Sequence, residues 1–419
     1  MPASKRGAEY LLIALLVVAL GGVVWTKLDR EAPPKVPDVE PPPMKVVEPR
    51  VVPEVGTMGY DKQTYVVQGG TWRGRPAVGD VNGDGLADIV ACNRLENGLN
   101  VFLQQSDGTW KVSNEGIPDD LSYGGIALGD VDEDGDPDIV FTTHKAPVHV
   151  LLNDSKAHWT VSNEGLKNAD VTNAVALGDL TGDGHLDIVA VAQFKGGLFV
   201  WHGDGKGKWE ADTNPTSMQA YQGIGKFGTD VKLADIDGDG DLDILALMEL
   251  GLKPLCNDGH GVFTLEQSNL PSPTIGGSLF AVCAGDLDGD RYPEVVVGGG
   301  VDPTKEIGIA NRGMSVFKLD RETGQWLLAG KGLDPREVCH DVALADMDAD
   351  GKLDLVTASI DRKVTFWRGG GKGGFTESAR IPGAERRGRL VLADLNGKGA
   401  LEVLTVSTEN GAVDYFSRD

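Results

Sequence analysis

One acidic loop of nine residues recurs seven times along this chain, and it limits the possible folds more than any other feature. Successive copies are separated by about 50 residues, the length of one β-propeller blade. Each copy follows a short apolar segment and runs into a β-branched one, so the pattern on both sides is that of strands. The copies begin at Asp80, Asp130, Asp179, Asp235, Asp286, Asp346 and Asp394.

The second repeat shows the order of strands that we predict within one unit. Residues 126–128 precede the loop, residues 139–141 follow it, and residues 148–152 make a third strand. A fourth strand begins at Trp159, and the other complete repeats carry an aromatic residue at the same place. Four antiparallel strands per repeat make one blade. The sequence therefore predicts an all-β fold, a seven-bladed β-propeller of four-stranded blades.

The two ends of the repeat region predict how the ring closes. The seventh repeat stops after its third strand, at residues 412–416. Residues 63–68, ahead of the first repeat, read as the missing fourth strand, with Tyr65 at the aromatic position. We expect this N-terminal strand to complete the last blade, because closure removes an unpaired sheet edge. The predicted propeller domain spans residues 61–419.

Each loop reads Asp-x-[Asp/Asn]-x-Asp-Gly-x-x-Asp, a pattern that suits calcium. The ion takes roughly six to eight oxygen ligands, and acids at positions 1, 3, 5 and 9 of a tight loop can converge on it. EF-hand loops continue into a helix, whereas position 9 here runs directly into a strand. The predicted ligands are Asp80, Asn82, Asp84 and Asp88 in repeat one; Asp130, Asp132, Asp134 and Asp138 in repeat two; Asp179, Thr181, Asp183 and Asp187 in repeat three; Asp235, Asp237, Asp239 and Asp243 in repeat four; Asp286, Asp288, Asp290 and Glu294 in repeat five; and Asp346, Asp348, Asp350 and Asp354 in repeat six.

Three repeats depart from the pattern. Thr181 replaces an acid in repeat three, which predicts weaker binding, and Arg291 replaces the glycine in repeat five. Repeat seven has Lys398 at position 5, where an ammonium group could replace the ion. We therefore expect about six Ca²⁺, in blades one to six, and none in blade seven.

The charge of the chain agrees with bound cations and argues against some partners. There are 39 basic and 63 acidic residues, for a net charge of −24. Such a chain is not expected to bind nucleic acid or to dock on anionic lipid. Oxygen-only ligands favour calcium over zinc or copper. Because every acid of the loop serves as a ligand, we expect the calcium to be structural.

The loops and their spacing resemble the FG-GAP/VCBS repeat family, which includes the propeller of integrin α-subunits. The resemblance implies a calcium loop between the first and second strands of each blade. Family members include adhesion receptors, lectin-like binders and repeat domains attached to enzymes, so the motif specifies fold better than function. Repeat seven departs from the family pattern, and repeat five does so in part.

The N-terminal segment predicts a membrane anchor. Residues 1–9 include Lys5 and Arg6 and are expected on the cytoplasmic side, and residues 10–25 form an uncharged run between Tyr10 and Trp25. A helix of this length spans about 24 Å, slightly short of the ~30 Å hydrocarbon core. A cleaved signal peptide is the alternative. Either reading places the propeller on the periplasmic or extracellular side, and we expect a bacterial protein.

Two further sequence features have simple interpretations. Residues 26–60 are rich in proline and predict an extended, semi-rigid linker, although such a segment can also serve as a docking ligand.

The four cysteines show no CxxC spacing, so they predict neither a zinc motif nor a redox pair. Buried thiols are the expected state, and a Cys256–Cys283 disulfide is the alternative in an oxidising compartment.

Two long excursions predict a partner site on the face opposite the calcium loops. Residues 214–230 enter blade four, and residues 299–314 lie within blade five. Adjacent blades would bring them together, and binding residues concentrate on such loops. The candidates are Tyr221, Lys226, Lys305 and Arg312, and a tolerated insertion without function is the alternative.

A second candidate site is the mouth of the central channel. The residues that precede the inner strands should line it: Arg75, Tyr123, Asn173, Asp230, His340, Asp341 and Arg389.

The sequence favours a non-enzymatic binding or scaffold module that presents its loops to a protein or glycan at the cell envelope. Lectin-like sugar binding is one alternative. An enzyme that acts on polysaccharide is another, and its catalytic candidates would be His340, Asp341 and the channel arginines Arg75 and Arg389. No nucleophile elbow, histidine cluster or isolated carboxylate pair supports catalysis.

Overall fold

The computed structural model describes residues 59–418, except for residues 61, 95–97, 120, 122–123, 144–147, 167–170, 193–196, 267–269, 271–278, 302–312, 360–363, 382–387 and 408–410. The described residues belong to one compact unit, Val55–Asp419. The predicted anchor at residues 10–25 lies outside them, as do residues 1–9 and nearly all of the linker. Within the described part of the chain, no helix has the length and apolar character needed to span a bilayer.

The strands form seven antiparallel sheets of four strands each, as the repeats predict. Blade one contains β2 (Trp72–Gly79), β3 (Asp88–Asn93), β4 (Leu99–Gln104) and β5 (Trp110–Val112). Blade two contains β6 (Ile126–Gly129), β7 (Asp138–Phe141), β8 (His149–Leu152) and β9 (Thr160–Val161). Blade three contains β10 (Thr172–Gly178), β11 (Asp187–Ala192), β12 (Leu198–Gly203) and β13 (Trp209–Ala211).

The remaining blades follow the same order. Blade four contains β14 (Gly228–Ala234), β15 (Asp243–Met248), β16 (Gly251–Asn257) and β17 (Phe263–Leu265), and the helix α2 (Pro215–Gly223) precedes it. Blade five contains β18 (Leu279–Gly285), β19 (Glu294–Gly299), β20 (Met314–Asp320) and β21 (Gln325–Leu328). Blade six contains β22 (Asp341–Ala345), β23 (Asp354–Ala358), β24 (Thr365–Gly369) and β25 (Phe375–Arg380). Blade seven contains β26 (Arg389–Ala393), β27 (Glu402–Ser407), β28 (Ala412–Ser417) and β1 (Lys62–Gln68).

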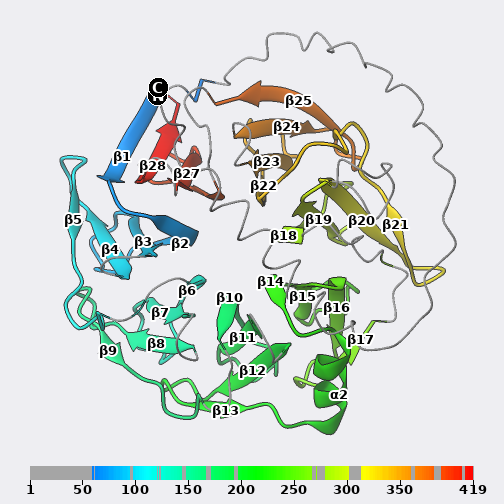
Figure 1. Cartoon of the computed structure of the whole chain (residues 1–419), viewed down its shortest axis with the longest axis horizontal. Coiled ribbons are helices and arrows are strands. Elements are labelled where there is room, and N and C mark those ends of the chain that lie inside the picture. The colour runs from blue at the N-terminus through cyan, green and yellow to red at the C-terminus, as the bar shows by residue number, and fades with distance from the viewer. Residues whose placement is uncertain are drawn as a thin grey trace, which may run out of the picture. The chain divides into compact units, whose positions relative to one another are not determined.

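The first strands of the repeats form the inner ring of the propeller. Each one, from β2 to β26, contacts the first strand of the next blade, and β26 contacts β2 to complete the circle. Figure 1 shows the blades radiating from this ring, with the later strands of each repeat farther from the centre. The second strands are buried along their whole length because blades cover both of their faces. The core therefore lies between neighbouring blades, and no blade has a core of its own.

The N-terminal strand closes the ring, which confirms the prediction from the chain ends. β1 pairs antiparallel with β28, from Lys62 opposite Ser417 to Gln68 opposite Ala412. Figure 1 shows β1 and β28, which lie far apart in the sequence, side by side in this blade. Blade seven therefore has no open outer edge along β28, although the seventh repeat itself contains only three strands, β26, β27 and β28.

The aromatic residue of the closing segment is not the one predicted. The side chain of Tyr65 is 46% exposed, so it does not fill the aromatic position of blade seven. Tyr60, which we assigned to the linker, is buried among apolar residues of blades six and seven. Its ring stacks on Phe366 with centroids 4.9 Å apart, and its hydroxyl donates to the carbonyl of Leu401. A change of register between Tyr65 and Val67 accompanies this arrangement.

Replacing Tyr60 with alanine should therefore weaken closure of the ring. Removing a buried aromatic side chain costs about 3–5 kcal/mol of unfolding free energy, and here a hydrogen bond is lost as well. Chemical denaturation of Y60A compares this cost with that of Y65A, a matched tyrosine on the exposed side of the same segment, which should change stability little. Equal losses in the two variants would contradict the assignment of Tyr60 to the core.

Candidate metal centres

The first aspartate of each loop holds the loop in shape. In blade one, Asp80 accepts hydrogen bonds from the backbone N–H groups of Gly83 and Gly85. The bond from position 6 to position 1 recurs in all seven blades. Gly85 has φ of 84°, a conformation that glycine adopts without strain. Arg291 takes the same conformation in blade five with φ of 78°, which is unfavourable for a residue with a Cβ atom.

The ninth residue of each loop is a buried acid that ties the loop to its blade. In blade two, one carboxylate oxygen of Asp138 accepts from the N–H of Val131, at position 2 of the loop. The other accepts from the N–H of Asn153, just after β8. The first of these bonds occurs in all seven blades, with glutamate in blades five and seven. Position 9 therefore has a structural role that the sequence analysis did not assign.

Oxygen atoms at position 3 give the clearest indication of a cation. One carboxylate oxygen of each of Asp132, Asp288 and Asp348 is buried and accepts no hydrogen bond. A buried carboxylate oxygen without a partner is costly, and a metal ion is one partner that removes the cost. Acids of the same loop surround these atoms, which is the donor set of a hard divalent cation. The residues present therefore fit calcium.

Acidic groups converge in four of the loops. Oxygen atoms of three acids lie within 4.8 Å of one another in blades two, four, five and six, and the groups are Asp130, Asp132 and Asp138; Asp235, Asp237 and Asp239; Asp286, Asp288 and Asp290; and Asp346, Asp348 and Asp354. Blades one and three have an asparagine or threonine at position 3, which still offers an oxygen. The loops could thus hold several calcium ions, which would connect the start of the loop to its end.

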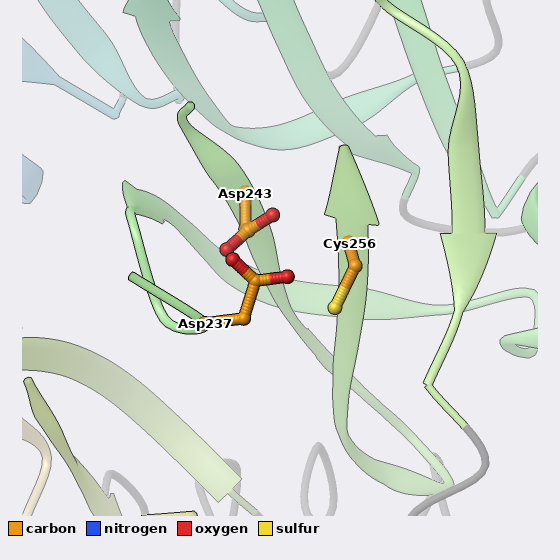
Figure 2. A group of neighbouring side chains, drawn as sticks. All are labelled: Asp237, Asp243 and Cys256. Carbon is orange, nitrogen blue, oxygen red and sulfur yellow. The ribbon is translucent and has the colours of Figure 1, made fainter. Parts of the chain in front are cut away.

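Blade four adds a sulfur atom that the motif does not contain. Figure 2 shows the thiol of Cys256, on β16, beside the carboxylates of Asp237 and Asp243. The sulfur and one oxygen of each acid lie within 4.8 Å of one another. Burial, followed by the charge of Asp243, raises the pKa of Cys256 to about 12, so the thiol keeps its proton at neutral pH. Cys256 and Cys283 are both thiols, so the alternative disulfide between them is not formed.

In the last loop, Lys398 does not take the position of the ion, contrary to the expectation from the sequence. The side chain of Lys398 is exposed and, within the described part of the chain, forms no ion pair with the acids of its loop. The amide of Asn396 donates instead to Glu402 at position 9. The acids of blade five do contact a lysine, Lys318 from β20, which the loop pattern did not predict.

The predicted partner residues do not form one surface patch. Lys305 and Arg312 lie outside the described residues. Lys226 is exposed, but Tyr221 is buried and its ring packs near Phe263. The hydroxyl of Tyr221 donates to Asp212 at 2.7 Å, so this residue supports the insertion from within.

The insertion before blade four forms the helix α2 and a cavity beside it. Asn214 begins the helix by accepting a hydrogen bond from the N–H of Thr216, and Pro215 follows as the first helical residue. A cavity of 340 Å³ lies between α2 and the outer part of blade three. It is lined by Leu198, Phe199, Val200, Trp201, Ala211, Asp212, Thr213, Met218, Tyr221 and Gln222.

The residues predicted at the channel mouth form an ionic cluster across the centre of the ring. Arg75 of blade one donates to Asp230 of blade four and to Asp341 of blade six. Both acids are buried. Arg389 of blade seven lies 3.7 Å from Asp341 and donates to two backbone carbonyls. The charges of four blades thus meet at one point.

The other predicted channel residues have structural contacts or lie outside the described chain. The ring of His340 stacks on Phe280 with centroids 4.7 Å apart. The amide of Asn173 donates to the carbonyl of Gly228 in the next blade. Tyr123 lies outside the described residues. The channel thus contains contacts between blades at the positions where a catalytic site was considered.

Comparison with known protein families gives a match to FG-GAP-like repeats at residues 80–141, 130–190, 179–246 and 346–405, which together cover more than half of the chain. The chain belongs to the FG-GAP-like repeat family. The matched FG-GAP segments each run from one acidic loop through the next, so the family pattern coincides with the blades described above. No curated protein matches the sequence.

Two solved structures with TM-scores above 0.5 share the propeller fold, although their sequence identity to this chain is low. A lectin from Agrocybe aegerita that recognises non-reducing terminal N-acetylglucosamine is 20% identical, with a TM-score of 0.52 over 75% of this chain and 81% of the lectin. BBS1N, solved in complex with ARL6DN, is 13% identical, with a TM-score of 0.55 over 87% of this chain and 98% of that one. The exotype rhamnogalacturonan lyase YesX is 17% identical, with a TM-score of 0.48 over 88% of this chain and 75% of the lyase.

The effect of calcium on stability should depend on pH. Without metal, burial outweighs the backbone hydrogen bonds and raises the pKa of Asp88 to about 6 and that of Asp138 and Asp243 to about 7. The folded chain then binds protons that the unfolded chain has lost, so chelated protein loses stability as pH rises from about 4 to 7. A cation favours the ionised acids and reverses this loss.

Melting curves with calcium and with chelator test this expectation at pH 5 and pH 7.5. The gain in melting temperature on adding calcium should be larger at pH 7.5, and potassium at equal ionic strength should not reproduce it. A gain that is the same at both pH values would contradict the coupling.

Replacing Arg75 with methionine should destabilise the ring strongly. The change leaves Asp230 and Asp341 buried without their shared cation, and breaking a buried ion pair in this way costs about 3–5 kcal/mol of unfolding free energy. Urea denaturation measures the loss. Adding D230N and D341N should restore part of it, because the unpaired charges are then removed. A loss below about 1 kcal/mol in R75M would show that the cluster does not hold the blades together.

Proposed function

We propose that this FG-GAP propeller is a non-enzymatic binding or scaffold module that is held outside a membrane by its N-terminal segment. In this proposal calcium stiffens the loops of one face, and the insertion before blade four meets a protein or glycan partner. The observation that carries the proposal is the cavity between α2 and blade three, because there an inserted segment adds an apolar, partly open surface to the repeats.

The side chains around the cavity favour binding of a ligand over catalysis. Phe199 is half-buried, while Met218 and Gln222 are exposed at its edge. The acid in its wall, Asp212, accepts a hydrogen bond from the hydroxyl of Tyr221, which holds it in place. Apolar walls with a few polar groups are typical of binding sites. The buried acid of the channel, Asp341, is likewise occupied by Arg75, which favours a non-enzymatic protein over a polysaccharide-acting enzyme.

The fold neighbours agree with a binding role. The Agrocybe aegerita lectin recognises a sugar, and BBS1N was solved with a protein partner. Lectin-like carbohydrate binding is the second candidate, and an aromatic wall formed by Phe199 and Trp201 is the feature that favours it. Protein binding and sugar binding would both use the surface of the insertion at this cavity. The class of ligand that the protein binds, a protein or a sugar, decides between them.

Membrane capture with the full-length chain tests the proposal. The chain is cross-linked in native membranes with calcium present, and retained proteins are identified by mass spectrometry; a glycan array tests sugars in parallel. M218E, which puts a charge at the mouth of the cavity, should reduce retention at least tenfold. L327E is the matched control, because Leu327 is an exposed apolar residue on blade five, and it should bind like the wild type. Equal retention by M218E would contradict a site at the cavity.

A further inference from the structure

The acids of the blade five loop already surround a cation that belongs to the protein. The Nζ atom of Lys318 lies 2.5 Å from Oδ2 of Asp288 and 2.7 Å from Oδ2 of Asp290. It also lies 3.1 Å from Oε1 of Glu294, an acid that is buried. These acids are positions 3, 5 and 9 of the loop, the set that would otherwise bind calcium.

The register of the strands explains how a lysine reaches this point. In blade five Val295 pairs with Phe317, so the next residues, Glu294 and Lys318, face each other across β19 and β20. The same register puts one residue of the third strand opposite the ninth acid in every blade. These residues are Leu103, Leu152, His202, Cys256, Lys318, Arg368 and Ser417.

The side chain opposite the ninth acid differs in charge from blade to blade, and this charge affects the acids of the loop. In blades one and two it is leucine, which cannot offset the charge of the acids. In blade six Arg368 contacts Asp348 alone, at 2.5 Å, and is more than half exposed. Among the described residues, only in blade five does one side chain contact three acids of the loop at once.

We propose that Lys318 is the resident cation of blade five, where it takes the place of calcium. The residue opposite the ninth acid can thereby supply the positive charge that an external ion would otherwise supply. This inference rests on the proposed calcium sites of the other blades. It differs from the expectation from sequence, which gave blade five a calcium ion and placed the substituting lysine in blade seven.

A tethered ammonium group has an advantage over a free ion at this place. Its backbone is fixed by the pairing of β19 with β20, so its position does not depend on the calcium concentration. A calcium ion would have to displace it from the same three acids, and like charges so close together repel strongly. Arg291 at position 6 adds a further positive charge to the loop. Blade five should therefore keep its shape when calcium is removed.

Counting bound ions tests the proposal directly. The full-length chain is analysed by native mass spectrometry after equilibration with calcium, as wild type and as K318L, which installs the leucine of blades one and two. K318L should bind one more Ca²⁺ per chain than the wild type. L152K makes the opposite change in blade two and should bind one fewer. K208L is the matched control, because Lys208 forms an exposed ion pair with Glu164 and neither residue belongs to an acidic loop, so its ion count should not change.

Stability in the same variants separates ion substitution from a merely structural lysine. In chelator K318L should melt at a lower temperature than the wild type, and calcium should restore the difference in K318L. If K318L does not fold, K318Q provides the same test with a side chain of similar length.

The outcomes distinguish the two proposals. If the wild type binds ions and K318L and K318Q bind the same number, Lys318 does not replace calcium and this inference is overturned, while the calcium loops stand. If no variant binds calcium, the calcium sites themselves are absent, and the metal part of the proposed function is overturned with it.

Discussion

Repulsion between neighbouring carboxylates is the constraint on which the rest of this structure depends. Each loop brings acids together between the first and second strands of a blade, and the ninth acid is buried where water cannot screen it. Backbone N–H groups satisfy part of the ninth acid, as Val131 and Asn153 do for Asp138. They leave the oxygen at position 3 without a partner in several blades. A cation would complete the loop, and we propose two sources for it, an ion from solution or a side chain of the protein itself.

The same problem is solved without metal at the centre of the ring. Seven inner strands converge there, and burying a single charge at that point would be costly. Arg75 joins Asp230 and Asp341 from blades on different sides of the ring, and Arg389 lies beside them. Ion pairs of this kind add little stability compared with apolar packing, but they specify which groups must meet. The cluster therefore favours one arrangement of the blades among several that apolar packing alone would allow.

The sequence predicted what is local and periodic, and it missed what depends on register between strands. The number of blades, their strand order and the closing role of β1 follow from repeats that each carry their own signal. Tyr60 was assigned to the linker because its partners, Phe366 and Leu401, lie more than 300 residues away in sequence. The burial of Tyr221 could not be seen either, since it depends on α2 packing against β17.

Lys318 shows that part of the missing information was present in the sequence. It lies within the third strand of its blade, at the same register position as Leu103 and Cys256 in other blades. Aligning the third strands of the repeats, as well as their loops, would have placed a lysine opposite Glu294. The loop pattern alone identifies ligands and cannot reveal what faces them, because the facing residue comes from the strand that folds back. In a propeller, then, the chemistry of each loop is set jointly by its own acids and by the next hairpin, and repeats with equal motifs can differ in the cation they need.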